Sequence, residues 1–283
     1  MPLLLEDPDV SGVRSVARRP VAPHAKLTHT TADLRDPAVR RALAGCDVIA
    51  HLGFQLWKTP DAAGVNLGGT ANVIAAGPKQ IVLASSAAVY GAWPDNPLPL
   101  TERDPARPNR QCAYAEHKLE AERRCEYEAF TISLRICAVL GPNADRLVKK
   151  AAAGSKQVVP AARNRRYAVQ FLHEDDAAAA LHAAVKSSTA DGVYNIATED
   201  WLDEHAVADV SGGRVVRMPF PVLLHGAEVA RRLRLLDMGA DRAVLLNGPL
   251  ALDATKAAND LGWKASKGSA QVLREFLGTI DDT

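Results

Sequence analysis

Three side chains have the types and spacing needed for proton transfer at a substrate oxygen. Tyr114 and Lys118 lie four positions apart in a stretch with helical periodicity, so we expect both to project from one helix face. Ser86 closes a short apolar run that is typical of a buried strand, and parallel-sheet enzymes bind ligands at the carboxyl ends of their strands. A free tyrosine is a poor base at neutral pH, but a neighbouring ammonium favours its phenolate. The pattern predicts a catalytic site in which Lys118 primes Tyr114 and Ser86 hydrogen-bonds the same substrate oxygen.

Short β-rich runs and helix-like stretches alternate along the chain that must position these residues. The expected strands are 13–17, 27–30, 48–52, 81–84, 131–136, 169–172 and 193–197, and the expected helices are 37–43, 65–76, 113–130 and 175–185. This alternation predicts an α/β fold with a doubly wound parallel sheet of the Rossmann type.

The pattern loosens after residue 142, which suggests a second, smaller part of the chain. We expect residues 1–142 to form the nucleotide-binding core, with 168–198 returning to it. Residues 143–167 and 199–283 would then form a smaller C-terminal lobe that binds the substrate.

Charge and cysteine content narrow the class of partner. Lys and Arg total 34 against 33 for Asp and Glu, so nothing favours binding to nucleic acid or to an acidic membrane surface. The four cysteines show no zinc-ligand spacing, and no export or membrane signal is visible. These features predict a cytoplasmic protein that binds a small-molecule substrate and no metal.

Several ordered motifs resemble those of one enzyme family. The segment 85–91, followed by Tyr114 and Lys118, resembles the Ser/Tyr/Lys active site of the extended short-chain dehydrogenase/reductase family. Further matching segments are 33–36, 51–53, 66–73, 141–142, 171–176, 193–196 and 252–263. The chain is therefore identified as a member of this family, in its NAD-dependent epimerase/dehydratase branch.

The resemblance implies a cofactor and the residues around it. Asp33 and Leu34 would lie beside the adenine, and Leu52 and Gly53 would bind the cofactor from the end of the next strand. Tyr114 and Lys118 would contact its nicotinamide end. The family also implies a possible homodimer formed through the helix at 113–130 and the helix before it.

The end of the strand at 13–17 bears on the choice of cofactor. Arg18 and Arg19 follow it, and an arginine there can pair with the 2′-phosphate of NADP, which favours NADP(H) over NAD(H). Two solvated arginines at the start of a loop are an equal alternative.

The sequence departs from the family at its beginning. Such enzymes open with a strand and a G-x-x-G-x-x-G turn that holds the cofactor pyrophosphate, and no such turn occurs here. We interpret residues 1–6 as the tail of the first helix. A misplaced start, a relative that has lost its cofactor and a rearranged amino terminus remain open explanations.

Two functions follow from these observations. The first is an NAD(P)-dependent oxidoreductase, epimerase or dehydratase that transfers hydride at a carbonyl or hydroxyl carbon of a sugar nucleotide or similar small molecule. The alternative is a non-catalytic Rossmann-fold ligand sensor or regulator that has lost cofactor binding. His173 is not expected to be catalytic, because Asp175 or Asp176 is predicted to cap a helix at that point.

Overall fold

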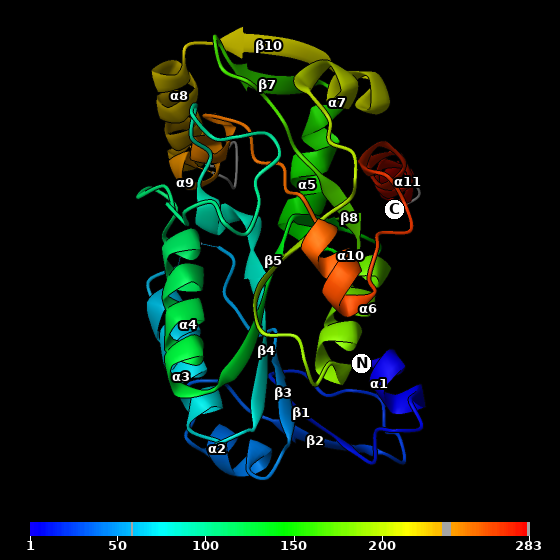
Figure 1. The fold of residues 1–283 in the computed structure, drawn as a ribbon. Coiled ribbons are helices and arrows are strands. Elements are labelled where there is room, and N and C mark those ends of the chain that lie inside the picture. The colour runs from blue at the N-terminus through cyan, green and yellow to red at the C-terminus, as the bar shows by residue number, and fades with distance from the viewer. Residues whose placement is uncertain (58, 234–238, 282–283) are drawn as a thin grey trace.

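A computed structural model describes residues 1–57, 59–233 and 239–281 of the chain (Figure 1). The strands are β1 Val13–Ala17, β2 Leu27–Thr31, β3 Val48–His51, β4 Gln80–Ser86, β5 Phe130–Ile136, β6 Ala138–Leu140, β7 Val158–Ala162, β8 Phe171–His173, β9 Gly192–Ile196 and β10 Arg214–Met218. The α-helices are α1 Pro2–Glu6, α2 Ala38–Leu43, α3 Gly69–Ile74, α4 Ala113–Glu128, α5 Arg146–Ser155, α6 Glu174–Lys186, α7 Glu204–Ser211, α8 Phe220–Arg232, α9 Ala240–Ala243, α10 Thr255–Leu261 and α11 Ser269–Asp281. Short helices of other types are η1 Gly64–Gly68, η2 Ala87–Tyr90 and η3 Val244–Leu246.

A four-stranded parallel sheet with the order β3-β4-β5-β9 forms the centre of the molecule. Helices α3 and α4 cover one face and α6 covers the other (Figure 1). Because both faces are covered, β4 and β5 are buried almost throughout, as their continuous apolar runs predict. The expected α/β doubly wound fold is therefore confirmed.

Strands β1 and β2 form a separate parallel pair at one end of this sheet. Within the described residues, β1 pairs only with β2 and β3 pairs only with β4, so no strand joins the two sheets. In a Rossmann fold the first strand lies between the second and the fourth strands. By the family resemblance, β1 corresponds to the second of these strands and β3 to the fourth. The expected helix at 1–6 is present as α1.

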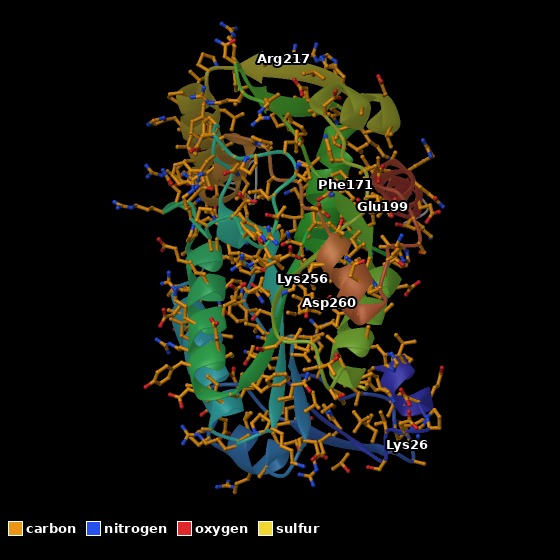
Figure 2. All side chains as sticks on the ribbon, viewed as in Figure 1. Lys26, Phe171, Glu199, Arg217, Lys256 and Asp260 are labelled. Atoms are coloured by element: carbon orange, nitrogen blue, oxygen red, sulfur yellow. The ribbon has the colours of Figure 1, made fainter. Side chains whose placement is uncertain are left out.

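Contacts with α6 hold the N-terminal segment in place. The Asp7 carboxylate lies 2.9 Å from Nε2 of His182 and 3.2 Å from Nζ of Lys186. Lys26, labelled near α1 in Figure 2, donates a 2.7 Å hydrogen bond to the Asp7 carbonyl. These contacts connect Asp7, the residue after α1, to α6 and to the loop before β2.

A second parallel pair, β7 with β10, lies at the opposite end of the molecule from β1 and β2 (Figure 1). The buried side chains of this region form their own apolar cluster, which includes Val159, Val207 and Phe276. The pairing joins the expected lobe segments 143–167 and 199–283, and the division into core and lobe stays a prediction. Among the described residues, no helix is both long and apolar enough to cross a membrane.

Two details differ from the expectations. Helix α4 ends at Glu128 rather than at residue 130, because Ala129 is already extended and Phe130 begins β5. The cap of α6 is His173 and neither Asp175 nor Asp176, because Nδ1 of His173 accepts the Asp175 amide at 3.2 Å. The prediction of an aspartate cap was wrong because an imidazole nitrogen can accept the same hydrogen bond.

Candidate active site

Ser86 and Tyr114 meet at the carboxyl end of β4. Ser86 is the last residue of β4 and caps η2, and Tyr114 lies in the first turn of α4, which packs beside β4. The Ser86 hydroxyl lies close enough to the Tyr114 phenol to lower its pKa. The strand end and the helix start thus bring together two residues that are distant in the sequence.

Lys118 lies one turn further along α4 and is 3% exposed. Its Nζ donates to the Ala84 carbonyl and lies 3.7 Å from the centroid of the Phe54 ring. Burial lowers the pKa of Lys118 to about 7, although the Glu122 carboxylate opposes this change. The lysine therefore holds its charge less firmly at neutral pH than an exposed lysine does, which weakens the direct support that it gives to a Tyr114 phenolate.

Arg242, from α9, is a second cation at Tyr114. Its guanidinium carbon lies 4.9 Å from the centroid of the Tyr114 ring and 5.4 Å from that of Trp57. Burial raises the pKa of Tyr114, whereas the nearby Ser86 hydroxyl and the Arg242 charge lower it. No sequence signal pointed to Arg242, because α9 is remote in the chain and carries no matching motif.

Behind the site, Glu122 and Arg135 form a buried ion pair. Arg135 donates to Glu122 from Nε at 3.1 Å and from Nη2 at 2.7 Å, and Ser85 donates to the same carboxylate. Both charged residues are less than 10% exposed. This pair joins α4 to β5, one helical turn beyond Lys118.

Replacing Glu122 by Gln should destabilise the protein by about 3 kcal/mol or more, because Arg135 keeps its charge in a buried place without a carboxylate partner. The measurement is urea unfolding at neutral pH. Glu120→Gln is the control, since Glu120 pairs with Arg124 on the exposed face of the same helix and should contribute less than about 1 kcal/mol. Equal losses in the two variants would contradict the structural role of the buried pair.

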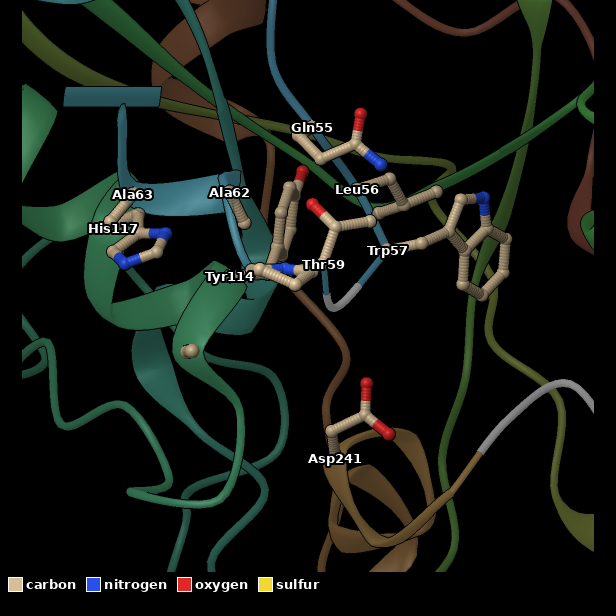
Figure 3. A pocket seen from close by; sticks show the side chains of 11 residues that line it. Gln55, Leu56, Trp57, Thr59, Ala62, Ala63, Tyr114, His117 and Asp241 are labelled. Atoms are coloured by element: carbon tan, nitrogen blue, oxygen red, sulfur yellow. The ribbon is translucent and has the colours of Figure 1, made fainter. Parts of the chain in front are cut away.

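A pocket opens beside Tyr114 (Figure 3). Its lining comes from the loop after β3, from the start of α4 and from α9, and comprises Gln55, Leu56, Trp57, Thr59, Pro60, Ala62, Ala63, Ala113, Tyr114, His117 and Asp241. In Figure 3, Asp241 faces Gln55, Leu56 and Trp57 from the other side of the pocket. Of these residues, sequence reasoning identified only Tyr114.

Asn66 holds the pocket loop in position. It is fully buried, accepts the Gln55 amide at 2.6 Å and donates to the Gln55 carbonyl at 3.1 Å. Its amide nitrogen also lies 3.2 Å from Nδ1 of His117. One side chain thus fixes both the loop after β3 and an imidazole on α4.

His51, at the end of β3, lies near the same loop. Its Nε2 is 3.0 Å from the Thr70 hydroxyl, and its ring centroid is 5.9 Å from that of Phe54. Burial, with a smaller effect of the Lys118 charge, lowers the pKa of His51 to about 3. His51 is therefore neutral at physiological pH and adds no charge to the site.

The residues expected at the adenine end lie after β1, β2 and β3. The Asp33 carboxylate accepts 2.9 Å hydrogen bonds from Arg35, which lower its pKa to about 2, and the Arg18 charge contributes to this. Leu34 packs so closely on Gly53 that a Cβ there would come within 2.3 Å of it. These residues form a cluster at the carboxyl edge of the sheets.

The remaining residues expected at the cofactor are exposed to solvent. Leu52 is 54% exposed, an unusual value for a leucine directly after a strand, and Arg18 and Arg19 are exposed as well. All three are accessible to a ligand that follows this edge. Their roles in cofactor binding stay predictions.

The described residues fit the two ends of a dinucleotide but not its middle. Ser86, Tyr114 and Lys118 suit the nicotinamide end, and the Asp33 cluster suits the adenosine end. The described residues contain no glycine-rich turn between these ends that offers its amides to a pyrophosphate. They also contain no group of three or more histidine, cysteine or acidic side chains that could hold a metal ion.

Comparison with protein families gives one match that covers most of the chain. Residues 2–197 match the family described as the NAD dependent epimerase/dehydratase family. The uncharacterized protein Rv0501 of Mycobacterium tuberculosis is 26% identical over 270 residues, which cover 87% of this chain and 69% of that protein. The uncharacterized protein y4nG of Sinorhizobium fredii is 28% identical over 260 residues, which cover 84% of this chain and 64% of that protein.

Several solved structures have the same fold. MoeE5, in complex with UDP-glucuronic acid and NAD, has a TM-score of 0.70 at 20% identity and covers 96% of this chain and 91% of its own. WbmG of Bordetella bronchiseptica, in complex with NAD and UDP, has a TM-score of 0.67 at 21% identity with coverages of 92% and 81%. The UDP-glucose 4-epimerase of Thermotoga maritima, with UDP-glucose, has a TM-score of 0.68 at 17% identity with coverages of 96% and 91%.

Proposed function

Because the chain belongs to the NAD-dependent epimerase/dehydratase family, we propose that it is an NAD(P)-dependent oxidoreductase that acts as an epimerase or dehydratase. Its target is a carbonyl or hydroxyl carbon of a sugar nucleotide or a similar small molecule. The observation that carries this proposal is the meeting of Ser86, at the end of β4, with Tyr114 and Lys118 on one face of α4.

Each residue of this group has a distinct task in the proposed reaction. Tyr114 accepts the proton of a substrate hydroxyl, or returns it to a carbonyl oxygen, from its phenol oxygen. Ser86 hydrogen-bonds the same oxygen and keeps it near Tyr114. Lys118 supports the phenolate and would hold the ribose at the nicotinamide end, while a bound nicotinamide would supply or accept the hydride.

The pocket beside Tyr114 suits a sugar ring. Trp57 offers an aromatic surface, and Gln55, Thr59 and Asp241 offer polar groups for hydroxyls. The complexes of MoeE5 with UDP-glucuronic acid and of WbmG with UDP support a nucleotide-linked sugar as the substrate class. We further propose that 143–167 and 199–283 form the substrate-binding lobe and that two copies pair through α4.

The cofactor of this proposal is a nicotinamide dinucleotide. Neighbouring structures that contain NAD favour NAD(H). The exposed Arg18 and Arg19 could pair with a 2′-phosphate, which favours NADP(H). Binding affinities for NADH and NADPH distinguish the two forms of the cofactor.

Titration of the 283-residue protein with NADH and with NADPH, followed by nucleotide fluorescence, tests the proposal. We expect saturable binding that Lys118→Ala weakens about tenfold or more, because a charged hydrogen-bond donor is lost from a buried place. Lys79→Ala is the control, since Lys79 is exposed and pairs with Asp47 at the surface. A loss of NADPH affinity in Arg18→Glu that exceeds the loss of NADH affinity would identify NADP(H) as the cofactor.

A second function is favoured by the lack of a glycine-rich turn in the described residues. In that case the chain is a non-catalytic ligand sensor or regulator. A protein that is folded by circular dichroism but binds neither nucleotide would overturn the enzyme proposal in favour of this one.

A further inference from the structure

Arg242 lies over two aromatic rings and forms a long ion pair with Asp241. Its guanidinium carbon lies 4.9 Å from the ring centroid of Tyr114 and 5.4 Å from that of Trp57. Nη2 donates to the Leu56 carbonyl, and Nε lies 3.8 Å from the Asp241 carboxylate. Nε is buried without a hydrogen-bond partner among the described residues. Two cation–π contacts, one backbone hydrogen bond and a long ion pair thus hold a cation against Tyr114.

The permanence of this charge distinguishes Arg242 from Lys118. A guanidinium stays protonated at every pH at which proteins are folded. Lys118 is nearer neutrality, because burial lowers its pKa to about 7, and its Nζ lies 5.7 Å from the Tyr114 ring centroid. Arg242 is both closer to the ring and always charged.

Other titratable groups also face Tyr114. From α4 and the residue before it come Lys118, His117 and Cys112, and from α9 comes Asp241. The thiol of Cys112 opposes ionisation of Tyr114, and Asp241 partly offsets the Arg242 charge. Among these groups, Arg242 is the one that carries a positive charge across the whole pH range.

We propose that Arg242 is a positioning residue that stabilises the Tyr114 phenolate and holds the ring in its orientation toward Ser86. The inference rests on the proposed function, because phenolate formation matters only if Tyr114 exchanges a proton with a substrate. It extends that function by giving Tyr114 two supporting cations, one from α4 and one from α9. The acidity of Tyr114 then depends on the packing of α9 against the loop at Trp57.

The test is the titration of Tyr114 itself, which requires neither cofactor nor substrate. 3,5-Difluorotyrosine, whose phenol is more acidic, is incorporated at position 114 alone, and its ¹⁹F NMR signal is followed against pH. In Arg242→Gln we expect the midpoint to rise by about one pH unit, because a cation is lost at roughly 5 Å from the ring. Arg242→Lys should restore part of the change, since it keeps the charge and loses the planar stack.

Arg231→Gln is the matched control, because Arg231 is a surface residue that pairs with Glu228 on α8. Its midpoint should equal that of the unchanged protein. An unchanged or lowered midpoint in a folded Arg242→Gln protein would overturn the inference. If Arg242→Gln does not fold, Arg242→Lys is compared with Arg231→Gln instead. A midpoint in Arg242→Lys that is higher by more than one pH unit would then overturn the inference. A raised midpoint in a protein that binds no nicotinamide nucleotide would leave the Arg242 inference standing while the proposed function fails.

Discussion

Tyr114→Phe should lower the turnover number by about 10²- to 10⁴-fold, while the affinity for sugar nucleotide and cofactor changes little. The phenol oxygen is the only atom group removed, and it is the atom proposed to exchange a proton with the substrate. The ring still packs edge-on against Phe54, at a centroid distance of 6.2 Å, so the pocket keeps its shape. A loss confined to the turnover number indicates an interaction made in the transition state.

The measurement is epimerisation or dehydration of UDP-glucose and UDP-glucuronic acid with added NAD or NADP. Tyr127→Phe is the control, because Tyr127 is 87% exposed near the other end of the same helix. If Tyr114→Phe and Tyr127→Phe retain the same turnover, Tyr114 is not the acid/base. If both retain ligand binding and the unchanged protein shows no turnover, the sensor function gains support.

The sequence alone predicted the parts of the candidate site that lie on a helix or a strand with a clear pattern of residues. Tyr114 and Lys118 are four residues apart on one helix, so their common face follows from helix geometry alone. Ser86 follows from the end of an apolar run, since a buried parallel strand is continuously apolar. The alternation of strands and helices along the chain predicted the doubly wound sheet that brings these residues together.

Contacts between distant segments were not predictable in the same way. Arg242 reaches Tyr114 only because α9 packs beside the loop at Trp57, and neither residue carries a periodic or motif signal. The low pKa of Lys118 likewise depends on burial beneath Phe54, which spacing does not reveal. The sequence therefore predicted the candidate reacting groups, but neither Arg242 nor the burial that lowers the pKa of Lys118.

Burial of the Lys118 ammonium should lower the stability of the folded protein, although the same side chain is expected to be needed for activity. Its folded pKa of about 7 lies below the ordinary lysine value of 10.5, so the unfolded chain binds more protons between these two pH values. Stability should therefore rise as pH increases from about 7 toward 10.5. Below pH 7 the lysine is charged in both states, and the full cost of burying the ammonium is present.

Lys118→Met should accordingly raise the free energy of unfolding at pH 7 by about 1 to 3 kcal/mol, because an apolar side chain of similar length replaces a buried charge. The gain is smaller than the pKa change alone implies, since the hydrogen bond to the Ala84 carbonyl and the contact with Phe54 are lost. The same variant should lose most of its turnover, as expected where a functional group is held at a cost in stability. Urea unfolding at pH 6, 7, 8 and 9 measures both the gain and its pH dependence.

The pH profile distinguishes this explanation from a general improvement in packing. Lys118→Met should flatten the rise in stability above pH 7, whereas Lys79→Met, at an exposed lysine, should keep the slope of the unchanged protein. A Lys118→Met protein that is less stable than the unchanged protein at pH 7, or that keeps the full slope, would show that the ammonium is well solvated or paired in the folded state. In that case Lys118 would be fully charged at neutral pH and could support the Tyr114 phenolate without Arg242.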